Sequence, residues 1–355
     1  MTEIRINKKL LTKQGPLYFI ADIGANHDGD IHRALKLIEF AKEAGADAAK
    51  FQNFKANTIV SRKGFSNIGQ LSHQAGWEKT VYEVYEDASI SQDWTGRLKE
   101  KCNEIGLDYF TSPYDFESAD HVDPYVDIYK IGSGDITWLQ ILEYIALKKK
   151  PVILATGASD MNDVQRAIAV LQKHTNDIVL MQCNTNYTGS KENFRYVNLN
   201  VLKSFAQLYP EIILGLSDHT SGHAAVLGAI ALGATFIEKH FTDDNDRTGP
   251  DHKFAMNPQT WREMVDRSNE LFPALGDGIK RVETNEIQTA MVQRRALRYA
   301  KNLSKGNIIT EQDIFPLRPY SEEGLHPYEI NLLRGKRLAT NVEADRLVTL
   351  KDFES

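Results

Sequence analysis

The sequence predicts a (β/α)8 barrel followed by a small separate domain, and three observations support this fold class. Apolar runs typical of buried parallel strands alternate with stretches of helical spacing eight times within about 270 residues, the size of such a barrel. These apolar runs end in charged or hydrogen-bonding residues, as barrel strands do where ligands bind. After residue 278 the alternation gives way to short strand-like runs separated by turns. A doubly wound open sheet is the alternative arrangement.

The eight expected strands are nearly continuous apolar runs, because a parallel strand is buried on both faces. They span residues 17–23, 46–53, 108–111, 126–131, 152–155, 178–181, 212–216 and 235–238. The expected helices follow them and span residues 31–44, 92–105, 116–121, 139–147, 161–174, 199–208, 221–232 and 258–271. In the first helix, Asp30 is a suitable N-cap and Gly45 is a suitable stop.

The segment from residue 54 to residue 89 is longer than an ordinary connection between a strand and a helix. Long loops inside compact domains are usually functional. Trp77, Val81 and Val84 recur there at helical spacing, so we expect an inserted helix over residues 76–87.

The chain is expected to divide into a barrel domain (1–281), a linker (282–295) and a small domain (296–355). The linker is polar and basic, as expected for a helical or extended tether. Strand-like runs in the small domain span residues 297–300, 308–309, 314–317 and 346–350.

Composition favours a soluble cytoplasmic protein. The 355 residues carry 42 Lys and Arg against 48 Asp and Glu, a net charge of −6, so neither nucleic acid nor a membrane surface is an expected partner. Two cysteines, Cys102 and Cys183, are too few for a disulfide framework and suit a reducing compartment. The N-terminal stretch lacks the apolar core of a signal peptide, and no apolar run reaches transmembrane length.

Two histidines follow neighbouring strands of the expected barrel. Residues 212–240 read as strand, helix and strand, so the two strands should lie parallel and side by side. Their carboxyl ends then bring His219 and His240 together, with Asp218 and Glu238 beside them. Two converging imidazoles near carboxylates predict a divalent-metal site with open positions.

Lysines and short hydroxyls gather at the other strand ends. Such a ring suits a phosphorylated or carboxylated anion, because ammonium groups neutralise the charge while hydroxyls and backbone amides orient it. Burying lysines inside strands without an anionic partner would be costly. The ring comprises Lys50, Ser112, Lys130, Ser133, Thr156, Thr185 and Ser217.

Three further carboxylates, Asp22, Asp135 and Asp251, can transfer protons or orient a sugar hydroxyl. Together, the anion site, the two-histidine metal site and these carboxylates indicate an enzyme. Its reaction would join an anionic substrate to a metal-bound carbonyl compound.

The segments ADIGANHDG, AKFQ, SPYD, YKIGSGD, PVILATG, GLSDHT, IEKHFTD and RTGPDHK occur in this order along the chain. They resemble the sialic acid synthase (N-acetylneuraminate synthase) family. The segments KGNIITEQDIFPLRP and LLRGKRLA resemble its C-terminal antifreeze-like (SAF) domain. The resemblance implies a (β/α)8 (TIM) barrel, a domain-swapped homodimer, and condensation of phosphoenolpyruvate with an open-chain N-acylated hexosamine to a nine-carbon 2-keto-3-deoxy acid.

The resemblance also implies roles for individual residues. It assigns His219 and His240 to a divalent metal, typically Mn²⁺ or Mg²⁺, and Asp22 and Asp135 to catalysis together with the two lysines. It assigns to phosphoenolpyruvate the residues Lys50, Ser112, Lys130, Ser133, Thr185 and Ser217. It assigns to the sugar Gln52, Tyr187, Asp251 and, from the partner subunit, Arg318.

Some residues depart from the family pattern, which usually has glutamate at Asp22 and Asp135 and often serine at Ala155. These changes leave open whether the sugar is N-acetylmannosamine or a diacetamido-trideoxyhexose. Two other functions also stay open. One is a related metal-dependent aldolase or a synthase of a shorter keto-deoxy sugar acid; the other is a non-catalytic carbohydrate-binding protein.

Overall fold

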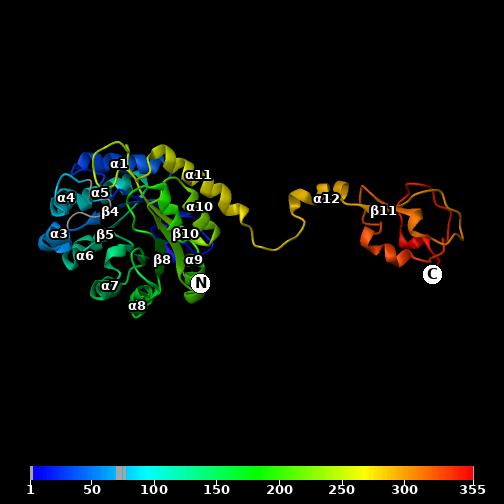
Figure 1. Ribbon diagram of the computed structural model, residues 1–355, viewed down its shortest axis with the longest axis horizontal. Coiled ribbons are helices and arrows are strands. Elements are labelled where there is room, and N and C mark those ends of the chain that lie inside the picture. The colour runs from blue at the N-terminus through cyan, green and yellow to red at the C-terminus, as the bar shows by residue number, and fades with distance from the viewer. Residues whose placement is uncertain (1–2, 69–73, 75–76, 355) are drawn as a thin grey trace. The chain divides into compact units, whose positions relative to one another are not determined.

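Eight parallel strands form a (β/α)8 barrel in the computed structural model of the chain, which describes residues 3–68, 74 and 77–354 (Figure 1). The strands run in the order β5-β4-β3-β10-β9-β8-β7-β6, and the edge strands β5 and β6 lie in contact, which closes the barrel. The expected fold class is therefore confirmed, and the open-sheet alternative is wrong. The strands are β3 (Tyr18–Asp22), β4 (Ala48–Asn53), β5 (Asp108–Pro113), β6 (Tyr129–Ile131), β7 (Val152–Ala155), β8 (Ile178–Cys183), β9 (Ile213–Asp218) and β10 (Ala234–His240).

A helix follows each strand. Asp30 accepts a hydrogen bond from the backbone N–H of His32 and so caps the first helix, as expected. The predicted β9 and β10 were too short, because pairing between them continues through Lys239 and Asp218. The helices are α1 (Ile31–Glu43), α5 (Gln92–Ile105), α6 (Phe116–Val122), α7 (Leu139–Leu147), α8 (Met161–Leu171), α9 (Val201–Leu208), α10 (Ala224–Ala231) and α11 (Pro258–Ala274).

The insertion between β4 and α5 contains three helices rather than the one expected. They are α2 (Ala56–Ile59), α3 (Arg62–Ile68) and α4 (Val81–Ala88). The expected helix over 76–87 begins later, because Thr80 and Glu83 form a capping box that starts α4. Gly76, the first residue of the expected helix, lies outside the described residues.

An antiparallel hairpin of β1 (Ile4–Ile6) and β2 (Lys9–Leu11) was not predicted. Lys9 forms an ion pair of 2.6 Å with Asp47, which precedes β4, so the hairpin lies at the amino ends of the barrel strands. The signal for it was the alternation of buried and exposed residues on either side of Asn7, whose φ of 50° suits a turn.

The chain divides into two units, Met1–Gly276 and Asp277–Ser355. The second unit has its own hydrophobic core and a two-stranded sheet of β11 (Ala296–Tyr299) and β12 (Ile314–Leu317). The strand-like runs at 308–309 and 346–350 make only isolated bridges, since their turns interrupt pairing. Residues 287–293, within the expected linker, form helix α12 (Ile287–Gln293).

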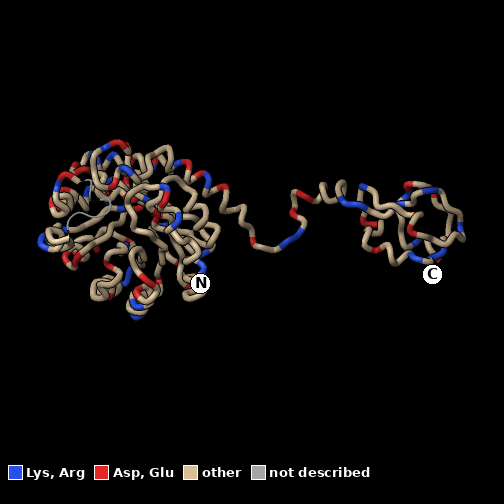
Figure 2. Tube along the Cα trace, in the orientation of Figure 1, with Lys and Arg blue, Asp and Glu red and all other residues tan. Residues whose placement is uncertain are grey.

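Acidic and basic residues are interspersed along the trace of both units (Figure 2). None of the helices in the described part of the chain combines the length and the apolar character needed to span a bilayer.

Candidate active site

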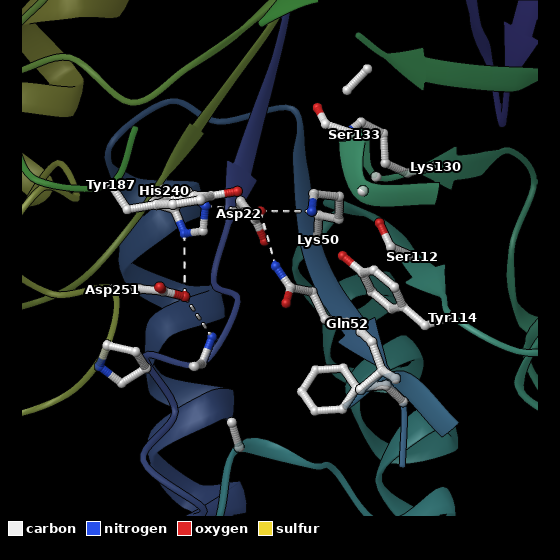
Figure 3. A pocket seen from close by; sticks show the side chains of 18 of the residues that line it. Asp22, Lys50, Gln52, Ser112, Tyr114, Lys130, Ser133, Tyr187, His240 and Asp251 are labelled. Atoms are coloured by element: carbon white, nitrogen blue, oxygen red, sulfur yellow. Dashed lines mark hydrogen bonds and ion pairs between the residues drawn. The ribbon is translucent and has the colours of Figure 1, made fainter. Parts of the chain in front are cut away.

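A cavity of about 380 Å³ opens at the carboxyl ends of the barrel strands. All of the predicted site residues line it except Thr156, Thr185 and Arg318. Figure 3 shows part of the cavity, with Asp22, Lys50 and His240 among the labelled side chains. The predicted residues at the cavity are Asp22, Lys50, Gln52, Ser112, Lys130, Ser133, Asp135, Tyr187, Ser217, His219, His240 and Asp251. Residues from many strands therefore converge on one space, as the barrel topology requires.

Lys50 on β4 and Lys130 on β6 form a cationic floor, and each is only 2% exposed. The Lys50 ammonium lies 2.7 Å from Asp22 Oδ2, and the Lys130 ammonium lies 2.9 Å from Glu238 Oε1. Burial alone would raise the pKa of Asp22, but the positive charge of Lys50 outweighs it and holds that pKa below its usual value. Asp22 is therefore an anion facing Lys50.

Asp22 replaces the glutamate that is usual in the family pattern, yet its shorter side chain reaches its partners. Its Oδ2 accepts from Lys50, and its Oδ1 accepts from the backbone N–H of Gly24 at 3.0 Å. The shorter carboxylate therefore contacts both the lysine and the backbone at this strand end. Ala155 also lines the cavity, so the absent serine hydroxyl would have faced the ligand space.

Short hydroxyls surround the lysine floor. Ser217 Oγ donates to Glu238 Oε1 at 3.3 Å, and Ser133 Oγ accepts from the backbone N–H of Gly157 at 2.9 Å. Within the described residues, the buried Ser112 Oγ and Glu238 Oε2 have no hydrogen-bond partner. Buried polar atoms of this kind need a ligand or water to satisfy them.

Two residues of the predicted ring do not line the cavity. Thr156 turns its hydroxyl to the carbonyl oxygen of Met181 at 2.9 Å. Thr185 lies behind Gly157, where a Cβ on the glycine would approach the threonine Cγ2 to 2.4 Å. Thr185 therefore packs against the backbone that carries the cavity wall.

His219 and His240 lie together, with 5.3 Å between their ring centroids. His219 Nδ1 lies 2.9 Å from the carbonyl oxygen of Asn184; the nitrogen that faces a carbonyl oxygen carries the proton, so Nε2 keeps its lone pair. Burial holds the pKa of His219 far below its usual value, which keeps the ring neutral. A neutral imidazole with a free lone pair is the form that binds a metal.

The donor set fits a divalent metal with only two histidine ligands. His240 Nδ1 is buried and has no hydrogen-bond partner among the described residues, although Asp251 Oδ2 lies 3.6 Å away. In the part of the chain that the structure describes, no group of three or more His, Cys, Asp or Glu side chains is placed to hold a metal. The remaining ligands would therefore be substrate or water oxygens, which Mn²⁺ and Mg²⁺ accept.

The residues predicted to contact the sugar surround the histidine pair. Gln52 Nε2 donates to Asp22 Oδ2 at 3.4 Å, and the Tyr187 ring meets the His219 ring edge-on at 4.5 Å. Asp251 Oδ2 accepts from the backbone N–H of Ala25 at 3.3 Å. Asp251 therefore joins the loop after β10 to the loop after β3.

Asp135 lies in a short 3₁₀ turn, Ser133–Asp135, that follows β6. Burial raises the pKa of this carboxyl to about 6. A carboxylate with that pKa is ionised at neutral pH but is a better proton acceptor than an exposed one.

The sequence interpretation missed several cavity residues. Glu238 was placed beside the histidines but was given no role, although its position two residues before His240 puts both on the inner face of β10. Tyr114 follows β5 directly, and its signal was the SPYD segment. The inserted segment was expected to be functional, and Trp77 and Val84 were named there for their helical spacing but not as cavity residues.

A family model described as "NeuB family" matches residues 37–280, and an SAF domain model matches residues 294–354. The chain belongs to the NeuB family. This confirms the resemblance read from the sequence, including the C-terminal SAF domain.

Relatives of this NeuB chain match it almost from end to end. The N,N'-diacetyllegionaminic acid synthase of Legionella pneumophila is 33% identical over 95% of both chains. A pseudaminic acid synthase of Campylobacter jejuni is 31% identical over 95% of this chain and 96% of its own length. The solved N-acetylneuraminic acid synthetase of Leptospira borgpetersenii, in complex with citrate, is 26% identical, with a TM-score of 0.72 over 81% of this chain and 94% of that one.

Proposed function

We propose that this chain is a nonulosonic (sialic) acid synthase. It condenses phosphoenolpyruvate with an open-chain N-acylated hexosamine to a nine-carbon 2-keto-3-deoxy acid and releases phosphate. The relatives that match nearly the whole chain are named as synthases of such acids. The observation that carries the proposal is the pair of buried lysines beside two converging histidines, because it places an anion site next to a carbonyl-activating site.

Lys50 and Lys130 bind the phosphate and carboxylate of phosphoenolpyruvate, and the hydroxyls of Ser112 and Ser217 orient it. Entry of the anion supplies the partner that Ser112 Oγ lacks in the free protein. Charge-assisted hydrogen bonds to buried ammonium groups are among the stronger polar contacts in proteins. Both lysines are held in place by carboxylates, so the anion meets a preorganised floor.

The π electrons of phosphoenolpyruvate form a bond from its carbon 3 to the aldehyde carbon of the sugar, and the C=O π bond of the aldehyde opens to an alkoxide that takes up a proton. Positive charge develops at carbon 2, where water adds, and Asp135 accepts the proton that the water loses. The tetrahedral centre then expels phosphate, whose charge the two lysines stabilise. Gln52, Tyr187 and Asp251 orient the sugar. His219 and His240 would hold a divalent cation, Mn²⁺ or Mg²⁺, which when bound polarises the aldehyde oxygen as a Lewis acid.

The proposed activity is tested by measuring phosphate release from phosphoenolpyruvate with N-acylated hexosamines, with mass spectrometry of the product. We expect phosphate release that depends on the sugar and a product of nine backbone carbons. Release only with shorter sugar phosphates would instead support the related keto-deoxy acid synthases, whereas release without any sugar would be plain hydrolysis of phosphoenolpyruvate. No turnover with any sugar would support the alternative that the chain is a non-catalytic carbohydrate-binding protein.

The metal site is tested by titrating Mn²⁺ into the protein in a calorimeter. His240→Ala should remove stoichiometric binding while leaving the thermal unfolding midpoint of the metal-free protein largely unchanged. His174→Ala is the matched control, because His174 lies after α8 beside Glu143 and away from the cavity. Full activity of the wild-type enzyme in excess EDTA would contradict the metal assignment.

We further propose a domain-swapped homodimer in which Arg318 of one chain completes the active site of the other. Arg318 is exposed and directly follows β12, in the SAF domain, so its guanidinium is available to a partner. A planar guanidinium donates two parallel hydrogen bonds, which suits sugar oxygens. Refolding an Arg318→Ala chain together with a Lys130→Met chain should restore activity through mixed dimers. Mixed dimers without activity would rule out completion in trans.

A further inference from the structure

The polarity of the cavity changes along one strand, β4. Side chains that are two residues apart on a strand share a face, so Lys50 and Gln52 follow one another toward the mouth of the barrel. Phe54, the first residue after the strand, also lines the cavity. The lysine is charged, the glutamine is neutral and polar, and the phenylalanine is apolar. Any ligand that spans this face therefore meets charge at its inner end and hydrocarbon at its outer end.

The outer end of the cavity has an apolar wall, defined here by Phe54, Ile59, Trp77, Val84, Tyr85 and Ala88. Apart from Phe54, the wall comes from the insertion between β4 and α5, which contributes no charged side chain to the described lining. The Phe54 ring packs against Tyr85 at 5.5 Å and against Tyr114 at 5.8 Å between centroids. Aromatic packing of this kind fixes the wall in place.

Cations are scarce in the cavity. Lys50 and Lys130 are the only lysines or arginines among the described lining residues, and both already face carboxylates. The residues 69–73 and 75–76, which the structure does not describe, include neither lysine nor arginine in sequence. Phosphoenolpyruvate would use both lysines, so a second phosphate would face Asp135 and Asp251 with no further lysine or arginine among the described lining residues. The arginine proposed to come from a partner chain, Arg318, is assigned to the sugar oxygens.

We infer that the acceptor sugar is an unphosphorylated deoxy-acylaminohexose, whose methyl groups pack on the apolar wall at the end remote from the aldehyde. The inference rests on the proposed synthase function and narrows its substrate class. Both a deoxy carbon and an acetyl group present a methyl where N-acetylmannosamine has hydroxyls. Placing a sugar hydroxyl against Phe54 or Val84 would remove water from it without a replacement hydrogen bond.

The experiment measures kcat/KM for three acceptors with saturating phosphoenolpyruvate. They are diacetamido-trideoxymannose, N-acetylmannosamine, and N-acetylmannosamine phosphorylated on its last carbon. We expect the first to exceed the second by at least about tenfold, the discrimination typical of one or two apolar groups in a pocket, and the third to be turned over poorly. Equal or better turnover of either of the other two sugars would overturn the inference. Absence of turnover with all three would instead refute the synthase function itself.

Variants in α4 test whether the wall causes the preference. Val84→Thr keeps the shape of the side chain but adds a hydroxyl, and Tyr85→Ser removes the ring. Each should lower the preference for the diacetamido sugar several-fold and leave the KM for phosphoenolpyruvate unchanged. Tyr82→Ser is the control, because the Tyr82 ring on the same helix lies 3.5 Å from the Arg62 guanidinium and is not part of the cavity lining. An unchanged preference in folded Val84→Thr would assign the discrimination elsewhere and overturn the inference.

Discussion

Two faces of strand β10 each carry a buried lysine–carboxylate pair, but the two pairs differ in whether protein groups satisfy all of their polar atoms. On the face away from the cavity, Lys239 lies 2.5 Å from Asp218 Oδ2 and donates to the carbonyl oxygen of Thr220 at 2.6 Å. Asp218 also accepts from the backbone N–H and the hydroxyl of Thr220. This outer pair is closed, because its charged atoms are satisfied by protein groups.

On the inner face, the pair formed by Lys130 and Glu238 is open. Glu238 Oε2 is buried and has no hydrogen-bond partner within the described residues, and the same holds for His240 Nδ1. The difference teaches that burial of charge alone does not mark a functional site. What distinguishes the inner pair is that its unsatisfied atoms belong to residues that line the cavity, where a ligand can complete their contacts. The closed pair holds the strand ends that carry His219 and His240, and the open pair faces the cavity.

The largest effect is expected from breaking the closed pair. Lys239→Met leaves Asp218 buried without its counter-charge, which typically costs about 3–5 kcal/mol of stability. We expect a loss of this size in the free energy of unfolding, measured by urea denaturation. Phosphoenolpyruvate affinity of the protein that remains folded should stay within a few-fold of wild type. A large loss of affinity without loss of stability would reverse the roles assigned to the two pairs.

A substitution on the open side should have the opposite effect on stability. The folded chain holds a proton on Asp135 up to a pH of about 6, whereas the unfolded chain loses it near its ordinary value of 3.8. The free energy of unfolding therefore falls as the pH rises from about 4 to about 6 and stays lowered above that. Asp135→Asn cannot ionise, so we expect it to be more stable than wild type above pH 6, by up to about 3 kcal/mol.

The same variant should lose turnover, because it lacks the proton acceptor. Urea denaturation at pH 4 and pH 7.5 checks the stability: the difference in the free energy of unfolding between variant and wild type should be small at pH 4 and large at pH 7.5. Phosphate release checks the activity. Wild-type activity in Asp135→Asn would exclude a catalytic role for this carboxylate. Asp135→Glu keeps the negative charge and restores the side-chain length that is usual in the family pattern. It therefore distinguishes the effect of the charge from the effect of the side-chain length.

Removing the lysine of the inner pair should weaken the binding of phosphoenolpyruvate. Lys130→Met keeps the side-chain volume but removes a charge-assisted contact, which is typically worth about 1.5–3 kcal/mol. We expect phosphoenolpyruvate affinity to fall by between ten- and about 150-fold, because each 1.4 kcal/mol is tenfold. Calorimetric titration measures this loss, and Lys50→Met should behave in the same way. Unchanged affinity in either variant would refute the anion assignment.

Much of the site could be predicted from the sequence because parallel strands repeat one geometry. The two-residue period puts Lys50 and Gln52 on one face of β4, and the strand–helix–strand unit brings His219 beside His240. These are local rules that hold whatever the rest of the barrel does. The fold class followed from the same repetition.

Contacts across the barrel and beyond the strand ends could not be predicted in this way. Lys130 and Glu238 are 108 residues apart, and their ion pair depends on how the barrel closes and on which rotamers fit inside it. Thr185 lies two residues after β8 ends, where the strand period no longer governs direction, and it packs behind Gly157. The apolar wall depends on how an inserted segment folds back over the mouth, which no spacing rule specifies.

The smallest effect is expected from an exposed ion pair of the same length as the open one. Arg267 lies 2.8 Å from Glu270 on α11, whereas Lys130 lies 2.9 Å from Glu238, so distance cannot distinguish the two pairs. Their side chains differ in exposure, at 51% and 65% against 3% and 4%. Water screens the exposed charges and solvates either one when its partner is removed, so little is lost.

Arg267→Met should therefore shift neither the urea midpoint nor the affinity for phosphoenolpyruvate by a resolvable amount. Removing a paired positive charge would then lower phosphoenolpyruvate affinity at Lys130 but have no measurable effect at Arg267. Burial rather than ion pairing would explain the difference. The comparison is made sharper by salt, because raising the ionic strength weakens exposed pairs and leaves buried ones nearly unchanged. If Arg267→Met lowered phosphoenolpyruvate affinity as strongly as Lys130→Met, the losses in both variants would reflect the net charge of the protein. Lys50 and Lys130 would then have no specific role in binding phosphoenolpyruvate.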